Sequence, residues 1–321
     1  MRNYWIGAIF GVIASLAIVA AAVEALSGLG RMPAPAISVV EHLDEKLRFL
    51  RDHPELTPEL VAVGSSITWR QLDGRPFAAK LGERNVLNGA AALLRVHQTR
   101  FLANFYADHY PRLRTMLMML GPTDLRHCDR EPETIFDKED AAGYIFERRA
   151  SLYYYFKYFA PLVYLRRAYT LERKRVPLTG EISFDRYGSG AMQWTPSMMQ
   201  GLRYEAIALE RPCIDALHHL VSDLSARGIR PVVVFPPIHP EYRQLFPQTI
   251  ADLKAVIKEL REATGEGVQI IDFIDDAAYG PDDFFDAFHL QWSAVQPFSE
   301  KLAREVLQGP TPTPTSTSLV R

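Results

Sequence analysis

The sequence predicts an α/β fold in which helices cover both faces of a parallel β-sheet. From residue 60 onward, short apolar segments alternate with segments of helical periodicity. The apolar segments are continuous hydrophobic runs, which are typical of strands buried on both faces. Alternation of strands and helices along a chain is typical of a parallel, doubly wound sheet.

Each expected element follows from its own pattern. The five expected strands are the apolar runs at residues 60–66, 84–89, 115–124, 230–237 and 268–273. The expected helices between and after them lie near residues 76–81, 93–110, 203–227, 249–264 and 293–307. Before the first strand, Leu43, Leu47 and Leu50 stand at helical spacing, which predicts an amphipathic helix over residues 41–53.

The N-terminal segment is the clearest pattern outside the sheet. Residues 4–23 carry no charge and reach the length that a helix needs to cross a bilayer. Arg2 precedes them, which favours a cytoplasmic N-terminus. We therefore expect residues 1–30 to anchor the chain in the inner (cytoplasmic) membrane with its body outside the cytoplasm. The alternative is a signal segment cleaved near the small residues 20–25, which would release a secreted or periplasmic protein.

The length of 321 residues fits one large domain with appendages. We expect an α/β domain over residues 31–308, with a helical insertion around residues 126–202, where no convincing strand occurs. The aromatic-rich stretch 151–169 is expected to pack this insertion onto the main core; a lid, a sugar-stacking surface and a membrane-facing patch are alternatives. Residues 309–321 alternate Pro with Thr and Ser and predict a disordered tail.

Composition and motifs exclude several classes of function. The formal net charge of −2 gives no basic footprint for nucleic acid. No phosphate-binding loop, dinucleotide fingerprint or HExxH motif is present, so neither a cofactor nor a metal is expected. Cys128 and Cys213 lack metal-ligand spacing. Two separate buried thiols are the favoured interpretation, and one disulfide in an oxidising compartment is the alternative.

Polar residues follow the expected strands at one edge of the sheet, where ligands of open parallel sheets bind. Serines follow the first strand, Asn88 the second and a Thr-Asp pair the third, while an Asp-x-x-His sequence comes after the fifth. A serine hydroxyl needs a neighbouring base to attack a carbonyl, and histidine serves best when a carboxylate orients it. These residue types therefore indicate a site for nucleophilic acyl transfer.

Four motifs, "VGSSIT", "LNGA", "LGPTDL" and "DAFHL", resemble in this order the four blocks of the SGNH (GDSL-like) hydrolase superfamily. The resemblance covers roughly residues 59–307, apart from the insertion. It implies a flavodoxin-like, three-layer α/β/α fold and cleavage or transfer of acyl esters. By position in the motifs, it implies Ser66 as the nucleophile, His289 as the general base and Asp286 as its orienting carboxylate.

The resemblance also implies an oxyanion hole. Its donors would be the backbone N–H of Ser66, an N–H at Gly89 or Ala90, and the side chain of Thr123. Two residues depart from the family pattern: Ser65 replaces an aspartate and Thr123 replaces an asparagine. A hydroxyl donates from a shorter side chain than an amide, so we expect a slow, specialised or rearranged site.

Four further residues are expected to line the cleft, namely Ser65, Asn88, Asp124 and His239. Asp124 is also expected to brace the loop after the third strand. Two further histidines, His218 and His219, are expected to be partly exposed or satisfied structural residues on a helix.

Two functions are consistent with these patterns. The first is a membrane-anchored serine esterase or O-acyltransferase that acts on acyl groups, acetyl being the expected case, of a cell-envelope or extracellular polysaccharide. A membrane-bound O-acyltransferase is its expected partner, because the layout resembles that of proteins of alginate acetylation and teichoic-acid D-alanylation. The alternative is an inactive scaffold or glycan-binding protein of the same fold. A hydrogen-bonding distance between Ser66 and His289 favours the enzyme.

Overall fold

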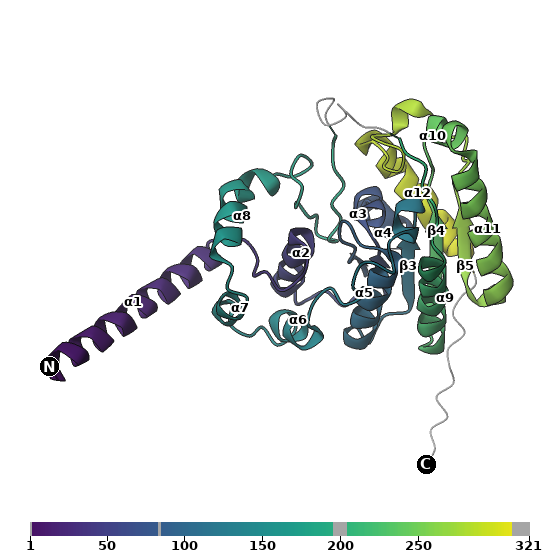
Figure 1. The fold of residues 1–321 in the computed structure, drawn as a ribbon. Helices are drawn as coiled ribbons and strands as arrows, with labels where there is room; N and C mark the ends of the chain where they lie inside the picture. Colours follow the sequence, from purple (N-terminus) through teal and green to yellow (C-terminus); the bar gives the residue numbers. More distant parts are fainter. Residues whose placement is uncertain (1, 83–84, 195–203, 310–321) are drawn as a thin grey trace, which may run out of the picture. The chain divides into compact units, whose positions relative to one another are not determined.

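The computed structural model describes residues 2–82, 85–194 and 204–309, which form two compact units (Figure 1). One unit, here called the helical unit, comprises residues 1–54 and 136–176. The other, the sheet unit, comprises residues 55–135 and 177–321. The predicted tail, residues 310–321, lies outside the described residues.

The sheet unit contains one five-stranded sheet in which all neighbouring strands are parallel. Its strands form at the five predicted positions, and they are β1 (Leu60–Val63), β2 (Val86–Asn88), β3 (Thr115–Met119), β4 (Arg230–Phe235) and β5 (Gln269–Asp272). The register pairs Val61 with Leu87 on one side and with Met116 on the other. Every residue of the first four strands is buried, which confirms a sheet covered on both faces.

The strand order is β2-β1-β3-β4-β5. This is the order of flavodoxin-like doubly wound sheets, in which the connections reverse direction between β1 and β3. Ligands of such sheets bind beyond the carboxyl ends of the strands on either side of this switch point. The residues that follow β1 and β3 therefore occupy the position where a site is expected.

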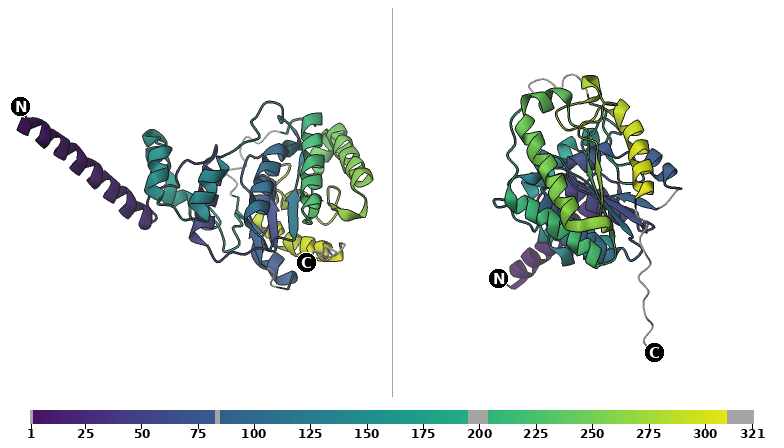
Figure 2. Two further views of the ribbon diagram at one scale, coloured as in Figure 1. Left: turned by 90° about the horizontal axis from the view of Figure 1, so that it is seen from below. Right: turned by 90° about the vertical axis from the view of Figure 1, so that its right-hand side faces the viewer.

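Helices cover both faces of this sheet (Figure 2). The helices of the sheet unit are α3 (Ser66–Gln71), α4 (Gly74–Lys80), α5 (Val96–His109), α9 (Arg211–Ala226), α10 (Pro240–Leu245), α11 (Pro247–Thr264) and α12 (Trp292–Gln308). Helices α3, α4 and α12 pack against each other and against one face, and α5 and α9 pack on the opposite face. The core beneath α12 joins Leu117, Val234 and Phe298, all fully buried. The helices expected near residues 76–81, 93–110, 249–264 and 293–307 are confirmed. The helix expected over residues 203–227 begins only at Arg211, because Pro212 stands in its first turn, and residues 204–210 are not helical. The short helices α3 and α10 are additional.

The helical unit contains no strand within its described residues. Its helices are α1 (Arg2–Gly28), α2 (Glu41–Asp52), α6 (Lys138–Ile145), α7 (Ser151–Lys157) and α8 (Pro161–Lys174). The amphipathic prediction for residues 41–53 is confirmed, because α2 buries Leu43, Leu47 and Leu50. The insertion predicted around residues 126–202 is divided: residues 136–176 belong to this unit, whereas residues 126–135 and 177–194 belong to the sheet unit.

Helix α1 is long and apolar enough to span a bilayer. Within Tyr4–Gly28, the most apolar 18-residue window has a mean hydropathy of 2.6, and none of this window is buried within the protein. At about 1.5 Å per residue, the 25 residues reach roughly 37 Å, which exceeds the roughly 30 Å hydrocarbon core of a bilayer. Among the described residues, no packing partner covers this apolar window, unlike the surface of a core helix.

The two cysteines form a disulfide between Cys128 and Cys213, which corrects the favoured interpretation of two separate thiols. The residues are 85 positions apart in the sequence, and their Cα atoms lie 5.3 Å apart. Spacing along the chain could not reveal this contact, because it arises when α9 packs beside the segment that follows β3. Disulfides persist in oxidising compartments, in agreement with the alternative named from the sequence.

Candidate active site

The turn after β1 presents Ser66 at the edge of the sheet. Gly64 has φ of +147°, and a Cβ atom there would lie 2.2 Å from Thr68 Oγ1. The Thr68 hydroxyl is within hydrogen-bonding distance of the carbonyl oxygens of Val63 and Met119, and it accepts from the Met119 N–H. Only glycine fits this turn, which brings the chain directly from β1 into α3 with Ser66 as the first helical residue.

The two adjacent serines have different environments. Ser65 is the N-cap of α3, and its Oγ accepts from the Ile67 N–H at 3.2 Å. Ser66 follows as the first residue of the helix, where backbone N–H groups have no acceptor within the helix. The Ser66 N–H is therefore suited to bind an oxyanion, whereas Ser65 supports the turn.

Ser66, His289 and Asp286 form one continuous hydrogen-bonded chain. The distance from Ser66 Oγ to His289 Nε2 is 3.0 Å. His289 Nδ1 lies 2.8 Å from Asp286 Oδ2 and 3.0 Å from Asp286 Oδ1. The structure thus brings Ser66 into contact with His289, which lies 223 positions later in the sequence.

The loop between β5 and α12 holds the histidine and the carboxylate in place. An antiparallel bridge joins Phe284 to Leu290 and closes this loop. Asp286 Oδ1 also accepts from the backbone N–H groups of Phe288 and His289, each at 2.8 Å. Because the carboxylate is fixed by its own loop, it can orient the imidazole without further rearrangement.

Electrostatics favour an ionised Asp286 beside a basic imidazole. Burial raises the pKa of Asp286, but the charge and hydrogen bond of His289 and the two backbone N–H groups outweigh burial and lower it below 3.8. Burial likewise lowers the pKa of His289, but the neighbouring Asp286 outweighs it and raises this pKa above 6.5. An imidazole with this pKa is matched to accepting a proton near neutral pH.

The predicted backbone donors of the second block have other acceptors. The Gly89 N–H donates to the Ala62 carbonyl oxygen at 2.8 Å, and the Ala90 N–H donates to Asn88 Oδ1 at 3.2 Å. Neither group is a free donor to the site in this structure. Gly89 instead gives room to Tyr106, since a Cβ atom at Gly89 would lie 2.5 Å from the tyrosine ring.

Asn88 is buried, and its side chain forms hydrogen bonds with the backbone. Its Nδ2 donates to the Trp69 carbonyl oxygen at 3.2 Å, while its Oδ1 accepts from Ala90. It therefore joins the end of β2 to α3, behind the nucleophile. Among the predicted oxyanion donors, the Ser66 N–H and the Thr123 side chain remain.

The segment after β3 carries Thr123 and is firmly held. Arg95 Nη1 donates to the Thr123 carbonyl oxygen at 2.9 Å. The His127 N–H donates to Glu210 Oε2 at 2.6 Å, and the Cys128–Cys213 disulfide joins the same segment to α9. Thr123 is therefore presented by a rigid loop, as an oxyanion donor requires.

Asp124 braces the loop after β3, as predicted, and also contacts the turn after β1. It is fully enclosed, its Oδ2 accepts from the Gly121 N–H at 2.8 Å, and it is hydrogen-bonded to the Ser65 side chain. Burial raises the pKa of Asp124 to about 6, against the opposing effects of these hydrogen bonds and of Arg95 and His289. Ser65 and Asp124 thus connect the turns after β1 and β3.

His239 contacts the loop that carries Asp286 and His289. Its Nδ1 accepts from the Glu241 N–H at 3.1 Å, which caps α10, and its backbone N–H donates to the Ala287 carbonyl oxygen at 3.0 Å. Its ring packs edge-on against Phe284, with the centroids 5.2 Å apart. Burial lowers the pKa of His239, so this histidine is neutral where His289 is basic.

A cavity of about 160 Å³ lies beside the Asp286 carboxylate. Thr123 and Asp286 both contribute to its wall, so it adjoins the proposed oxyanion donor. The other lining residues are Arg126, Tyr204, Glu205, Ile207, Tyr242, Ala287 and Phe288. Its volume lies below the roughly 300–1,000 Å³ of drug-sized sites, and neither Ser66 nor His289 lines it.

Two residues near the triad were not expected from the sequence. Trp194 stacks on Phe285 with ring centroids 3.8 Å apart, and its ring lies 6.2 Å from that of His289. Arg70 is buried, donates to the Gly190 carbonyl oxygen at 2.7 Å, and acts to lower the pKa of His289. Trp194 lies in an irregular segment and Arg70 in a short helix, so no periodic pattern indicated either residue.

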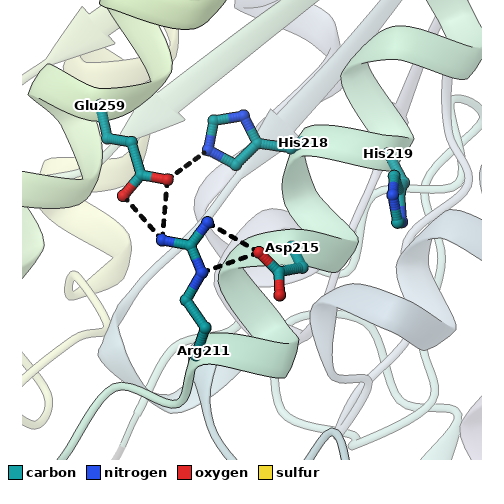
Figure 3. Close-up of a pocket in the computed structure, with 5 residues that line it drawn as sticks. All are labelled: Arg211, Asp215, His218, His219 and Glu259. Carbon is teal, nitrogen blue, oxygen red and sulfur yellow. Dashed lines mark hydrogen bonds and ion pairs between the residues drawn. The ribbon is translucent and has the colours of Figure 1, made fainter.

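A second histidine cluster lies at α9 and α11 of the same unit (Figure 3). Arg211 bridges Asp215 and Glu259, at 2.7 Å and 2.9 Å, and His218 Nε2 lies 3.1 Å from Glu259 Oε1. His219 is exposed and points away from this network (Figure 3). The expectation that both histidines are structural or partly exposed agrees with these contacts.

Within residues 2–82, 85–194 and 204–309, no group of three or more His, Cys, Asp or Glu side chains could hold a metal ion. The arrangement at Ser66 is instead one that can generate a nucleophilic oxygen. In comparisons with known proteins, no family model matches the chain, and no curated protein matches it significantly.

Proposed function

We propose that this protein is a serine-dependent ester hydrolase or O-acyltransferase of the SGNH type. The observation that carries the proposal is the continuous chain from Ser66 Oγ through His289 to Asp286, with links of 3.0 Å and 2.8 Å. The strand order and the placement of Ser66 and Thr123 on either side of the switch point support the same assignment.

In the first half of the reaction, Ser66 Oγ attacks the carbonyl carbon of an acyl ester while His289 Nε2 takes the hydroxyl proton. Asp286 stabilises the resulting imidazolium. The tetrahedral intermediate places its negative oxygen toward the Ser66 N–H and the Thr123 hydroxyl. Collapse of this intermediate breaks the ester C–O bond, and His289 returns the proton to the departing alcohol, leaving an acyl-serine.

In the second half, an acceptor hydroxyl attacks the acyl-serine with His289 again as the base. Water gives a hydrolase and a sugar hydroxyl gives a transferase. In either case Ser66 leaves as the hydroxyl after receiving the proton from His289. The ring of Trp194 lies against the catalytic loop and can limit access of water to this step.

The small cavity supports a short acyl group. Its volume of about 160 Å³ is well below the roughly 300–1,000 Å³ of drug-sized sites. Two tyrosines and a phenylalanine provide apolar walls, with Arg126 and Glu205 as polar members. Acetyl groups on a cell-envelope or extracellular polysaccharide are the substrate class that we propose.

The proposed location is outside the cytoplasm, with α1 spanning the inner membrane. The apolar length of α1 and the disulfide in the sheet unit both support it. A membrane-bound O-acyltransferase remains the proposed partner, because the transferase version of the enzyme needs a donor of acyl groups outside the cytoplasm.

The test is hydrolysis of aryl acetate, butyrate and octanoate esters by the full-length protein in detergent. We expect the acetate to be cleaved fastest and Ser66→Ala to reduce cleavage to the buffer rate, while Ser65→Ala retains measurable activity. Equal cleavage by wild type and a folded Ser66→Ala variant would overturn the assignment of the nucleophile. Faster cleavage of octanoate would overturn the short-acyl assignment alone.

A further inference from the structure

The α7–α8 segment exposes large apolar side chains within the helical unit. The α7–α8 surface comprises Phe156, Phe159, Leu162, Leu165 and Tyr169. Leu162 is 79% exposed and Tyr169 is 92% exposed, although both belong to a regular helix. Large apolar side chains exposed in neighbouring turns of one segment indicate a binding face.

The spacing of these residues gives α8 two distinct sides. Leu162, Leu165 and Tyr169 are three and four positions apart, so they share one side of the helix. Tyr164 and Leu171 lie on the opposite side and are buried in the protein. The exposed residues are therefore not left over from incomplete packing, because α8 already has a separate packed side.

Ion pairs join the packed side of α8, and Arg175 directly after α8, to acidic residues of α2. Arg167 Nη1 lies 2.7 Å from Asp44 Oδ2, Lys174 Nζ 2.7 Å from Glu41 Oε2, and Arg175 Nη2 2.7 Å from Glu45 Oε2. The Asp44 and Glu45 side chains are nearly inaccessible to solvent. These contacts hold α8 in one orientation and keep Leu162, Leu165 and Tyr169 directed outward.

Helix α1 belongs to the same unit and ends beside this segment. The Leu152 N–H, in the first turn of α7, donates to Glu24 Oε1 at 3.2 Å. Arg175, which follows α8, donates to the Gly30 carbonyl oxygen at 2.6 Å. Both ends of the α7–α8 segment thus contact the last turns of α1 or the residues directly after it. A bilayer that contains α1 would reach its surface at this level.

We infer that the α7–α8 surface lies in the interfacial layer of the membrane that α1 spans. Aromatic side chains are enriched at the level of the lipid headgroups, and apolar residues on one side of an interfacial helix insert below them. Arg166 and Arg173 are exposed on the same side of α8 and can reach the phosphates of anionic lipids. The inference rests on the proposed membrane-spanning role of α1 and is independent of the catalytic assignment.

The test uses the full-length protein in liposomes of phosphatidylcholine and phosphatidylglycerol. Because the two native cysteines form a disulfide, an introduced cysteine is the only free thiol and can carry a fluorescent NBD label. Labels are placed at Leu162→Cys and Tyr169→Cys, at Ile13→Cys within α1, and at Glu139→Cys on the exposed polar part of α6. Lipids that carry a doxyl quencher near the headgroup or deep in the acyl chain report the depth of each label.

We expect emission at positions 162 and 169 to shift to shorter wavelength and to be lost with shallow-doxyl lipids, whereas position 139 is unaffected. Position 13 should be quenched by deep-doxyl lipids. Quenching at position 13 without quenching at 162 and 169 would overturn the inference and leave the anchor intact. Absence of quenching at position 13 would overturn both. Protection of positions 162 and 169 only in native membranes, and not in liposomes, would assign the surface to a protein partner and also overturn the inference.

Discussion

Two clusters in the sheet unit combine a histidine with a carboxylate, and only one of them has the geometry of a catalyst. At the sheet edge, His289 contacts Asp286 through one ring nitrogen and Ser66 through the other. At α9 and α11, His218 contacts Glu259, which also pairs with Arg211 (Figure 3). The second cluster offers no hydroxyl to activate, and its carboxylate is already neutralised by arginine.

The comparison teaches that placement in the fold separates the two clusters better than composition does. The residues of the first follow the carboxyl ends of strands and come from segments far apart in the sequence. The residues of the second lie on the outer surfaces of two neighbouring helices. Exposed ion pairs of this kind contribute about 0–1 kcal/mol each. The outer cluster is therefore a surface feature, whereas the edge cluster has the hydrogen-bonded geometry that the proposed chemistry requires.

Removing the carboxylate from each cluster gives the largest contrast. Asp286→Asn keeps the shape of the side chain but no longer stabilises a charged His289. We expect kcat for aryl acetate hydrolysis to fall roughly 10⁴-fold, as in other serine triads. The matched change Glu259→Gln at His218 should leave kcat unchanged. Similar losses in both variants, with both folded by circular dichroism, would remove the distinction between the clusters.

A smaller effect is expected at the oxyanion donor. Thr123→Val removes the hydroxyl and nearly preserves the side-chain volume, so we expect kcat to fall roughly 100-fold with little change in KM. Thr123→Ser should restore most of the rate because it restores the donor. Wild-type kinetics in the valine variant would exclude Thr123 from the oxyanion hole.

The smallest effect concerns pH. His289 must be neutral to take the Ser66 proton, and Asp286 raises its pKa above 6.5, so kcat/KM should increase with pH through a midpoint above 6.5. Asp124 also acts to raise this pKa, and its own pKa of about 6 leaves it charged near the midpoint. Asp124→Asn should therefore move the midpoint of the pH–rate profile downward. An upward shift, or a wild-type midpoint below 6.5, would contradict the assigned electrostatics.

The sheet and the triad could be predicted because their signals are local and ordered. Continuous apolar runs marked the strands, and Ser66, Asp286 and His289 lay in short motifs at strand ends. Helices α3 and α10 have six residues each, too few to show a helical period. The occupied N–H groups of Gly89 and Ala90 depend on acceptors in β1 and Asn88, which no motif specifies.

Contacts between distant segments account for the other differences. The disulfide requires α9 to pack beside the segment after β3, and Trp194 reaches the triad loop from an irregular segment. The association of α2 with α6 and α8 depends on tertiary packing and buried ion pairs. Such contacts depend on how the chain folds, and no repeating pattern of residues in the sequence predicts them.

The central claim is that Ser66 is a nucleophile activated by His289. Its most direct test is reaction of the full-length protein with a fluorophosphonate, followed by fragmentation of the tryptic peptide 52–70, which contains both Ser65 and Ser66. We predict one phosphonyl group per chain, located on Ser66, and its loss in His289→Ala. A folded protein that remains unmodified, or carries the adduct on Ser65, would contradict the claim.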